Sequence, residues 1–519
     1  MKHVGLNVAA DPFMTLAYLG VGAGLVVISA DDPYCHSSQN EQDSRRYAQF
    51  AGIPCLDPKN PSEAREMAAY AFELSESFNI PVMLRPTTRV SHSRSDVEVG
   101  DMPPAGEAGH FVKNPAHRVA LPVHARPLHS ELLAKQERME AEMESAPWNR
   151  LVLRGKTGVI ASGIAGLYAQ EAIAELDEDL SLLCLGTYPL PVKMMRRMLE
   201  HVSRVMVIEE LEPVVEEQVK MLALKVNPGL EILGKEDSIP RQGELDILTV
   251  RNAIARMLKR PERAAGKSPN QSILPPRPPS LCPGCSHRAT YYAMRKVFGK
   301  NAIFPSDIGC YTMAVNMGTV DTCLCMGASI TLASGIRHGG EKEGICCSLG
   351  DSTFLHGGMT GLLNAAYNKA RITVAILDNS TTAMTGHQPH PGTGVTVTGE
   401  PTVQVSLEAL AKALGAGLVE TVDPYDLDET MKSFERARDY PGLSVIIARR
   451  ACVIKARKGG ERPRPLRVSE ECKGCKICID FGCPAIEFEE EKARINSLCT
   501  GCGVCAAICP ASAIVEVAP

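Results

Sequence analysis

Short apolar runs alternate with amphipathic stretches along most of the chain. Residues 1–100 contain apolar runs at 25–29 and 80–84, with a helical pattern at 62–76 between them. Residues 151–265 predict strands at 159–162, 182–185 and 205–208, and a helix at 166–176. Strands that alternate with helices in this way are typical of α/β domains built on parallel sheets. Residues 281–455 continue the same alternation and predict a further α/β domain.

Four other segments break this pattern. Residues 101–150 are irregular and then strongly charged, which predicts a connector with a helix at 130–144. Residues 266–280 are rich in proline, and residues 456–467 are basic and contain proline, so both predict linkers. The last segment, 468–519, is too short to bury a core of its own. The chain therefore predicts α/β domains followed by a small terminal domain.

Composition narrows the classes of function. The 519 residues carry a net charge of -5, which gives no indication of a nucleic-acid partner or an anionic membrane. No apolar run approaches the length needed to span a bilayer, and the start lacks the apolar core of a signal peptide, so a cytoplasmic protein is expected. Cysteine is abundant, at 19 residues. Without an export signal, this abundance points to metal or redox chemistry rather than to disulfides.

Eight of these cysteines form two runs near the C-terminus. Each run has three cysteines spaced by two residues and a fourth that precedes proline, a spacing typical of two-cluster ferredoxins. In that arrangement the fourth ligand of each [4Fe–4S] cluster comes from the other run. The expected ligand groups are therefore Cys472, Cys475, Cys478 and Cys509 for the first cluster, and Cys499, Cys502, Cys505 and Cys483 for the second.

The first run has one more residue before its last cysteine than the second, so one loop is expected to bulge without losing a ligand. A zinc site or a disulfide scaffold is the alternative reading. Zinc takes four ligands, usually in two pairs, and zinc sites do not require three evenly spaced cysteines with a fourth before proline. The clusters are also expected to hold the small domain together.

A second chemical signal lies in the third α/β segment. An apolar strand at 344–349 leads into Gly350, Asp351 and Ser352, a helix is expected at 358–369, and a strand at 372–377 leads into Asp378 and Asn379. In a β-α-β unit the two strands are parallel, so these polar residues emerge at one carboxyl edge of the sheet. Their oxygens suit Mg²⁺ that is partly held by phosphates. An ordinary turn at a strand end is the alternative.

Glycines near this edge carry two further expectations. Gly350 is expected to allow a tight turn. Gly357 and Gly358 are expected to lie near the start of the helix and to permit close approach of a phosphate.

This arrangement resembles the thiamine-diphosphate motif, in which Gly-Asp is followed some way downstream by asparagine. Asp378 stands where the motif commonly has its first asparagine, and Ser352 where it commonly has a second glycine. The resemblance implies that Asp351, Asn379 and the carbonyl of Thr381 bind Mg²⁺.

The whole chain resembles the alpha subunits of indolepyruvate:ferredoxin oxidoreductases, within the 2-oxoacid:ferredoxin oxidoreductase family. The matching segments are 29–33, 36–43, Cys282-Pro-Gly-Cys285 with His287 and Arg288, 307–311, Gly350 to Ser352, 385–388 and the two cysteine runs. The resemblance implies an α/β, transketolase-like multidomain fold with a C-terminal α+β ferredoxin domain. Residues 1–100 would be the remnant of a pyrimidine-binding domain, 151–265 a transketolase C-terminal-like domain, and 281–455 the thiamine diphosphate and Mg²⁺ domain.

The resemblance also implies a possible third cluster, held by Cys282, Cys285, Cys310 and Cys452. The alternative is that Cys-Pro-Gly-Cys is a turn lining the cofactor and that the other cysteines are buried thiols. Cys323, Cys325, Cys346 and Cys347 are expected in the core. His387 and His390 are candidates for contacting the diphosphate or a substrate carboxylate, with a solvated loop histidine as the alternative for His387, and Gly386 is expected to bind the cofactor. Arg85 or Arg89 is a candidate for facing substrate, with a salt bridge as the alternative.

The implied activity is oxidative decarboxylation of an aryl 2-oxoacid with coenzyme A, with electrons passing through the clusters to ferredoxin. A smaller beta subunit of the gamma-domain type is the expected partner, in a heterotetramer. Family members begin with a further stretch that carries a catalytic glutamate, so the chain is expected to be truncated or one half of a split subunit. A non-redox thiamine-dependent decarboxylase and a pure electron-transfer subunit are the alternatives.

Overall fold

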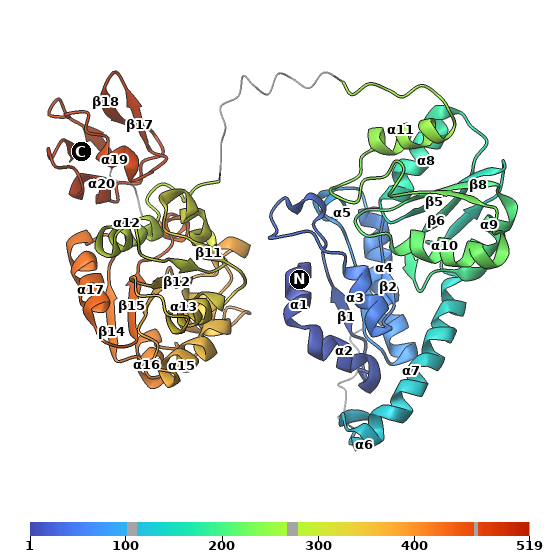
Figure 1. Cartoon of the computed structure of the whole chain (residues 1–519), viewed down its shortest axis with the longest axis horizontal. Helices are drawn as coiled ribbons and strands as arrows, with labels where there is room; N and C mark the ends of the chain where they lie inside the picture. Colours follow the sequence, from blue (N-terminus) through green and yellow to red (C-terminus); the bar gives the residue numbers. More distant parts are fainter. Residues whose placement is uncertain (101–111, 267–278, 461–464, 518–519) are drawn as a thin grey trace. The chain divides into compact units, whose positions relative to one another are not determined.

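The computed structural model describes residues 1–100, 112–266, 279–460 and 465–517. The chain divides into two compact units, Met1–Ile273 and Leu274–Pro519 (Figure 1). The proline-rich linker predicted at 266–280 lies almost wholly outside the described residues, as does the centre of the linker predicted at 456–467.

The first unit begins with a four-stranded sheet. Its order is β1 (Val26–Ile28), β3 (Val82–Leu84), β2 (Cys55–Leu56) and β7 (Thr187–Tyr188). The first three strands are parallel, and β7 runs antiparallel to β2. Helix α4 (Pro61–Phe78) connects β2 to β3 and begins where the Asn60 side chain accepts a hydrogen bond from the Glu63 amide. The strands and the helix predicted for residues 1–100 are confirmed.

The second sheet of this unit has five strands. Its order is β4 (Arg150–Val152), β6 (Ser181–Leu185), β5 (Thr157–Ser162), β8 (Arg204–Ile208) and β9 (Glu231–Leu233). All neighbours are parallel except β4 and β6. The helices that follow the strands are α8 (Ala165–Leu176), α9 (Val192–His201), α10 (Val214–Val226) and α11 (Ile247–Met257). The elements predicted for 151–265 are confirmed to within two residues at their ends.

The two sheets belong to one folded body rather than to separate ones. Strand β7 comes from the second segment yet completes the first sheet. One apolar core takes Ile53 and Met83 from the first segment together with Leu183 and Val207 from the second. Helix α7 (Pro122–Met143) begins eight residues before the predicted helix and buries Leu132 and Met139 against this unit.

A buried cluster of charges lies where the strands of both sheets end. The Arg45 guanidinium donates hydrogen bonds to Asp43, which precedes helix α3 (Ser44–Ala51), and to Glu209, which follows β8, at 2.5 and 2.8 Å. Arg85, which follows β3, donates to Asp31 at 2.7 Å and to Asp57 at 3.3 Å. These six side chains are nearly inaccessible to solvent, so each charge depends on its partner.

Electrostatics in the cluster follow from this pairing. Burial opposes ionisation of Asp43, but the charges of Arg45 and Arg85 hold the pKa of that carboxyl well below its usual range. Burial raises the pKa of Glu210 to about 7. Its carboxylate accepts a hydrogen bond from the Leu245 backbone amide. The candidate arginines of the substrate site are therefore in ion pairs: Arg85 is buried in this cluster, and Arg89 pairs with Glu244 at 3.0 Å.

In the second unit, a parallel sheet carries the third α/β domain. Its order is β12 (Cys346–Gly350), β13 (Thr373–Asp378), β15 (Ser444–Arg449) and β14 (Leu418–Val422). The helices around it are α12 (Ser286–Phe298), α13 (Ala328–His338), α15 (Met359–Tyr367), α16 (Leu407–Ala413) and α17 (Leu427–Asp439). Both β12 and β13 are buried throughout, as expected of a parallel sheet covered on two faces.

The C-terminal segment forms the predicted small α+β domain. Strands β16 (Leu466–Val468) and β19 (Ile514–Glu516) pair antiparallel, as do β17 (Ile486–Glu489) and β18 (Lys492–Ile495). Two one-turn helices, α19 (Ile477–Asp480) and α20 (Val504–Ala507), each carry the third cysteine of a run.

Two predictions about glycines are wrong. The helix after β12 begins at once, with α14 (Asp351–Thr353) and a π-helical turn over Phe354–Gly358, so Gly357 and Gly358 lie inside it rather than at its start. Gly357 instead lets the backbone of Gly327 pack closely. Gly350 is extended, with φ of −78°, and makes no tight turn. Its missing side chain leaves room for the Tyr311 ring, because a Cβ there would lie 2.9 Å from Tyr311 Cε1.

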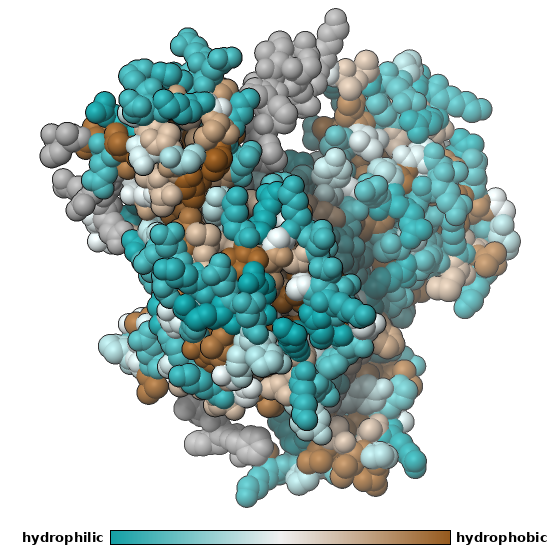
Figure 2. Space-filling view, turned by 60° about the vertical axis from the view of Figure 1, so that its left-hand side comes forward, coloured by the Kyte–Doolittle hydropathy of each residue, from teal (hydrophilic) through white to brown (hydrophobic). Residues whose placement is uncertain are grey.

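The surface is largely hydrophilic on the face drawn in Figure 2, with hydrophobic side chains scattered over it. Among the described residues, no helix combines the length and the apolar character that crossing a membrane requires.

The pairing in the first unit predicts unequal effects for two adjacent arginines. Arg45→Met would leave the buried Glu209 carboxylate without an ion pair and Asp43 with only Arg85, 3.8 Å away, and should lower the opening free energy of this unit by about 3–5 kcal/mol. Arg46→Met is the matched control, because Arg46 pairs with Glu217 at the surface, and it should cost about 1 kcal/mol or less. Amide hydrogen exchange of β5 and β8 in the full chain measures both. Equal protection in the two variants would contradict the pairing.

Candidate functional site

The polar edge of the second unit is formed where β12 and β13 end. Gly350 lies opposite Leu377 in the parallel register, so Asp351 and the loop that begins at Asp378 emerge together. One carboxylate oxygen of Asp351 accepts hydrogen bonds from the amides of Asn379 and Ser380, at 3.2 and 2.8 Å. The side chains of Asp351 and Asn379 are buried. The structure thus brings the two residues together, at the edge where the sequence predicts them.

A second carboxylate and a histidine complete this edge. His390 Nε2 lies 3.1 Å from the Asp351 carboxylate, and Asp378 accepts a hydrogen bond from Arg449 at 2.6 Å. Although burial opposes it, the hydrogen bond from His390 lowers the pKa of Asp351. Burial and the nearby charge of Asp351 raise the pKa of Asp378, against the effect of Arg449. The Asp351 carboxylate is therefore ionised and able to bind a cation, while Asp378 is paired with Arg449.

His287 reaches the same edge from helix α12. Its Nε2 lies 3.2 Å from the side-chain amide nitrogen of Asn379, and its ring packs edge-on against Tyr311. Burial lowers the pKa of His287 to about 4, so the ring is neutral at physiological pH. The sequence predicts a contact of His390 with the diphosphate or the substrate carboxylate, whereas the structure places its ring on Asp351. Sequence reasoning assigned no role at this edge to His287. The signal for His287 was its position two residues after Cys-Pro-Gly-Cys.

The remaining predicted cofactor residues lie on the loop that follows Asn379. Thr381 donates its amide to the Asn379 side chain at 3.1 Å, and Thr382 donates its hydroxyl to Ser352 at 2.9 Å. The amide of His387 bonds back to the Thr382 carbonyl, which returns Gly386 and His387 towards this edge. The Nδ1 atom of His387 is buried and lacks a hydrogen-bond partner among the described residues.

The donor set at this edge fits Mg²⁺ and a diphosphate. One carboxylate and one amide oxygen are within the two adjoining loops, and the Thr381 carbonyl belongs to the second of them. Hard oxygen donors of this kind leave coordination positions for phosphate oxygens. The orphaned nitrogen of His387 is a buried polar atom that a bound phosphate or carboxylate would satisfy.

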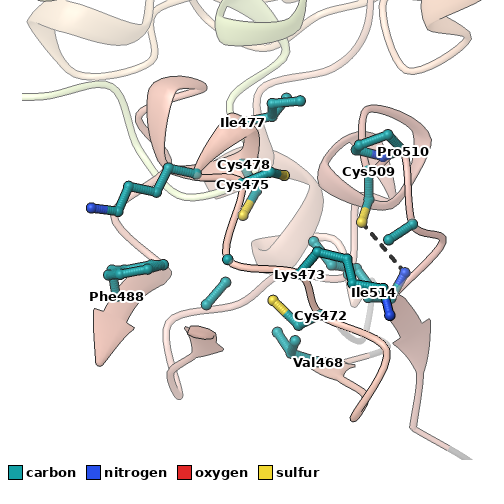
Figure 3. Close-up of a pocket in the computed structure, with 15 residues that line it drawn as sticks. Val468, Cys472, Lys473, Cys475, Ile477, Cys478, Phe488, Cys509, Pro510 and Ile514 are labelled. Carbon is teal, nitrogen blue, oxygen red and sulfur yellow. Dashed lines mark hydrogen bonds between the residues drawn. The ribbon is translucent and has the colours of Figure 1, made fainter. Parts of the chain in front are cut away.

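Two hollows in the C-terminal domain are lined by cysteines. In the first, the sulfurs of Cys472, Cys475, Cys478 and Cys509 surround one space (Figure 3). The second is lined by Cys483, Cys499, Cys502 and Cys505, together with Phe481 and Gly284. These are the two groups that the spacing of the runs predicts.

The backbone around both hollows is suited to thiolate-bound clusters. The Gly501 amide donates to the Cys499 sulfur, and the Ala513 amide donates to the Cys509 sulfur, each at 3.4 Å. Gly474, Gly501 and Gly503 have positive φ, which turns successive amides towards the sulfurs. Each hollow thus has four cysteines around it and backbone amides nearby, which fits a thiolate-bound cubane.

A third group of cysteines lies between the polar edge and the second hollow. Burial and the neighbouring thiols of Cys282 and Cys452 raise the pKa of Cys310. Burial raises the pKa of Cys285 to about 12, with the Cys282 thiol adding to it. The Cys452 amide donates to the Asn379 carbonyl at 3.0 Å, which ties this group to the polar edge.

Of the four cysteines expected in the core, two are buried and two are exposed. Cys346 and Cys347 are fully buried on β12, as expected. Cys323 and Cys325 are exposed, so their assignment to the core is wrong. Strand β11 (Thr322–Cys323) is only two residues long, and the chain leaves it at once for the loop before α13, which keeps these thiols at the surface.

Comparison with known proteins agrees with this geometry. Residues 307–448 match the thiamine pyrophosphate enzyme, C-terminal TPP binding domain family, and residues 494–515 match the 4Fe-4S binding domain family. The first match contains Asp351 and Asn379, and the second contains Cys499, Cys502, Cys505 and Cys509.

Curated relatives extend the likeness to the full chain. An indolepyruvate oxidoreductase subunit IorA from Pyrococcus abyssi is 45% identical over 100% of this chain and 86% of the relative. The subunit of the same name from Thermococcus kodakarensis is 43% identical over 98% and 84%.

The chain belongs to the indolepyruvate oxidoreductase IorA family.

Membership of the IorA family makes the chain an oxidoreductase subunit with a thiamine diphosphate-binding domain and an iron–sulfur domain. A further IorA subunit, from Methanothermobacter thermautotrophicus, is 42% identical over 99% of this chain and 85% of the relative. Among solved structures, a 2-oxoglutarate:ferredoxin oxidoreductase from Magnetococcus marinus aligns with a TM-score of 0.31 and 19% identity, over 34% of this chain and 66% of that one. That superposition is too limited to add to the assignment.

Proposed function

We propose that this chain catalyses the oxidative decarboxylation of an aryl 2-oxoacid of the indolepyruvate type with coenzyme A, and passes the electrons through iron–sulfur clusters to ferredoxin. One observation carries the proposal. Within the second unit, the third group of cysteines (Cys282, Cys285, Cys310 and Cys452) contacts the Asn379 loop on one side and the second cysteine-lined hollow on the other. Cys452 bonds to Asn379, and Gly284 of Cys-Pro-Gly-Cys lines the second hollow. The names of the relatives support the choice of substrate class.

Thiamine diphosphate and Mg²⁺ would be held at the polar edge. Asp351, Asn379 and the Thr381 carbonyl would bind Mg²⁺, and the cofactor would supply the nucleophilic carbon and the electron sink that decarboxylation of a 2-oxoacid requires. Gly350 and Ser352 flank the metal-binding carboxylate, and Ser352 holds the second loop through its bond to Thr382. Gly386 and His387 would face the diphosphate or the substrate carboxylate.

The two histidines have different tasks at this edge. His390 orients the Asp351 carboxylate, because its Nε2 and the two backbone amides share one oxygen. His287 is neutral and buried, so it positions Asn379 without adding a charge that would repel the metal. Burial of Asp351 and Asn379 also excludes water from the coordinating atoms, which strengthens their interaction with a cation.

Three [4Fe–4S] clusters would carry the electrons. The ligands would be Cys282, Cys285, Cys310 and Cys452 for the first along the path, Cys483, Cys499, Cys502 and Cys505 for the second, and Cys472, Cys475, Cys478 and Cys509 for the third. The contact between Gly284 and the second hollow favours this order. Among the cysteine neighbours of Cys505 are Cys483 and Cys478, one from each of the last two groups, which brings those groups close together.

The partner would be a smaller beta subunit of the gamma-domain type, in a heterotetramer, with external ferredoxin as the electron acceptor. The relatives are named as subunits, which favours an assembly of more than one chain. The acceptor would not need to reach the thiamine site, because the C-terminal domain would carry the electrons to it.

The first test is substrate-dependent reduction of a viologen dye by the native complex under anaerobic conditions. Indolepyruvate with coenzyme A should reduce the dye, and Asp351→Asn should abolish this and weaken Mg²⁺-dependent cofactor binding at least about 10–100-fold. Asp428→Asn is the matched control on an exposed helix position and should behave as wild type. Formation of aldehyde without dye reduction would contradict the proposal.

The second test counts iron in the anaerobically purified chain. Three clusters require about twelve iron atoms, four per cluster, and Cys310→Ser or Cys452→Ser should reduce this to about eight. Cys184→Ser, in the first unit, is the control and should retain about twelve. About eight iron atoms in the wild-type protein would show that Cys282, Cys285, Cys310 and Cys452 hold no cluster.

A further inference from the structure

Arg288 is a buried cation at the junction of the thiamine domain and the C-terminal domain. It lies on α12, three residues after Cys285, and is 3% exposed. Its guanidinium donates one hydrogen bond to the carbonyl of Leu281, on its own domain, and another to the carbonyl of Gly482, next to Cys483. The side chain therefore spans from one cysteine group to another.

The junction around Arg288 is closely packed. A Cβ on Gly284 would lie 1.9 Å from the Thr500 hydroxyl, so the Cys-Pro-Gly-Cys loop and the Cys499–Cys502 loop touch. Tyr425 donates its hydroxyl to the Gly284 carbonyl, and the Phe481 ring lies 6.0 Å from the Arg288 guanidinium carbon. These contacts leave little freedom for the guanidinium to move towards solvent.

The charge of Arg288 lacks an acidic partner. Among the described residues, no carboxylate forms an ion pair with it, and its Nε atom is buried without a hydrogen-bond partner. The groups that act on it electrostatically are the thiols of Cys483, Cys285, Cys282 and Cys502. An unpaired buried charge is strongly unfavourable, and arginine does not lose its proton in proteins. The site therefore fits a negative charge on the cysteines beside it.

We propose that Arg288 is the shared counter-cation of the Cys282–Cys285 site and the Cys483–Cys502 site, and that it stabilises the electron at the second of these. The inference rests on the proposed function, because it takes both sites as cluster sites. Each one-electron reduction, with the electron supplied by oxidation of the 2-oxoacid, adds one negative charge and makes or breaks no bond. A fixed positive charge nearby favours the reduced form and so raises its reduction potential.

The test is a redox titration of the anaerobic holo-complex, followed by electron paramagnetic resonance. Arg288→Met and Arg288→Gln remove the charge. They should lower the equilibrium constant for one-electron reduction of the cluster held by Cys483, Cys499, Cys502 and Cys505 tenfold or more, which lowers its reduction potential by about 59 mV or more. Arg288→Lys retains the charge and should stay close to wild type. The Cys472 group, which does not contact Arg288, serves as the internal reference and should not shift.

Tyr425→Phe is the matched control for packing, because it removes the hydrogen bond to Gly284 without changing charge, and it should leave the potentials unchanged. Full iron content with unshifted potentials in both neutral variants would overturn the proposal. Loss of iron from both neutral variants would also overturn it, since Arg288 would then be a brace for cluster assembly. A wild-type complex without clusters would instead refute the proposed function, so the two failures are distinguishable.

Discussion

The contact between the Cys-Pro-Gly-Cys loop and the C-terminal domain is the constraint on which the rest of the second unit depends. Gly284 touches Thr500, and Arg288 reaches across to the carbonyl of Gly482. Without this contact, the polar edge and the C-terminal domain would be two sites on one chain with no path for electrons between them. With it, the Asn379 loop, the Cys452 group and the two hollows form a continuous series. Electron transfer through these sites requires that each lies close to the next.

The polar edge itself follows from simple physical chemistry. Parallel strands that are buried on both faces must end together, and their carboxyl ends leave room for polar groups that the core cannot accept. Asp351 and Asp378 are tolerated there because backbone amides, His390 and Arg449 satisfy their oxygens. The buried charge cluster of the first unit follows the same principle at the ends of β3 and β8, with arginines in place of a metal.

Much of this arrangement is predictable from the sequence. The period of the apolar runs predicts β1 and β3 in the first segment, β5, β6 and β8 in the second, and β12 and β13 in the third, but not the other strands. The spacing of the cysteine runs groups the cysteines as the two hollows do. Contacts between distant segments are not predictable in this way. His287 and His390 reach Asn379 and Asp351 only through the fold, and Gly350 is needed because Tyr311 packs on it rather than because of a turn. Cys323 and Cys325 are exposed because β11 is too short to bury them.

The central claim is that electrons cross from the thiamine domain to the C-terminal domain at Gly284. Gly284 has φ of +70° and no room for a side chain, so Gly284→Val must push the Cys499–Cys502 loop away. Rapid-mixing spectroscopy of the anaerobic complex with indolepyruvate and coenzyme A would follow reduction of the C-terminal clusters directly. The account predicts that this variant retains its iron but reduces those clusters much more slowly than wild type. Reduction at the wild-type rate would contradict it.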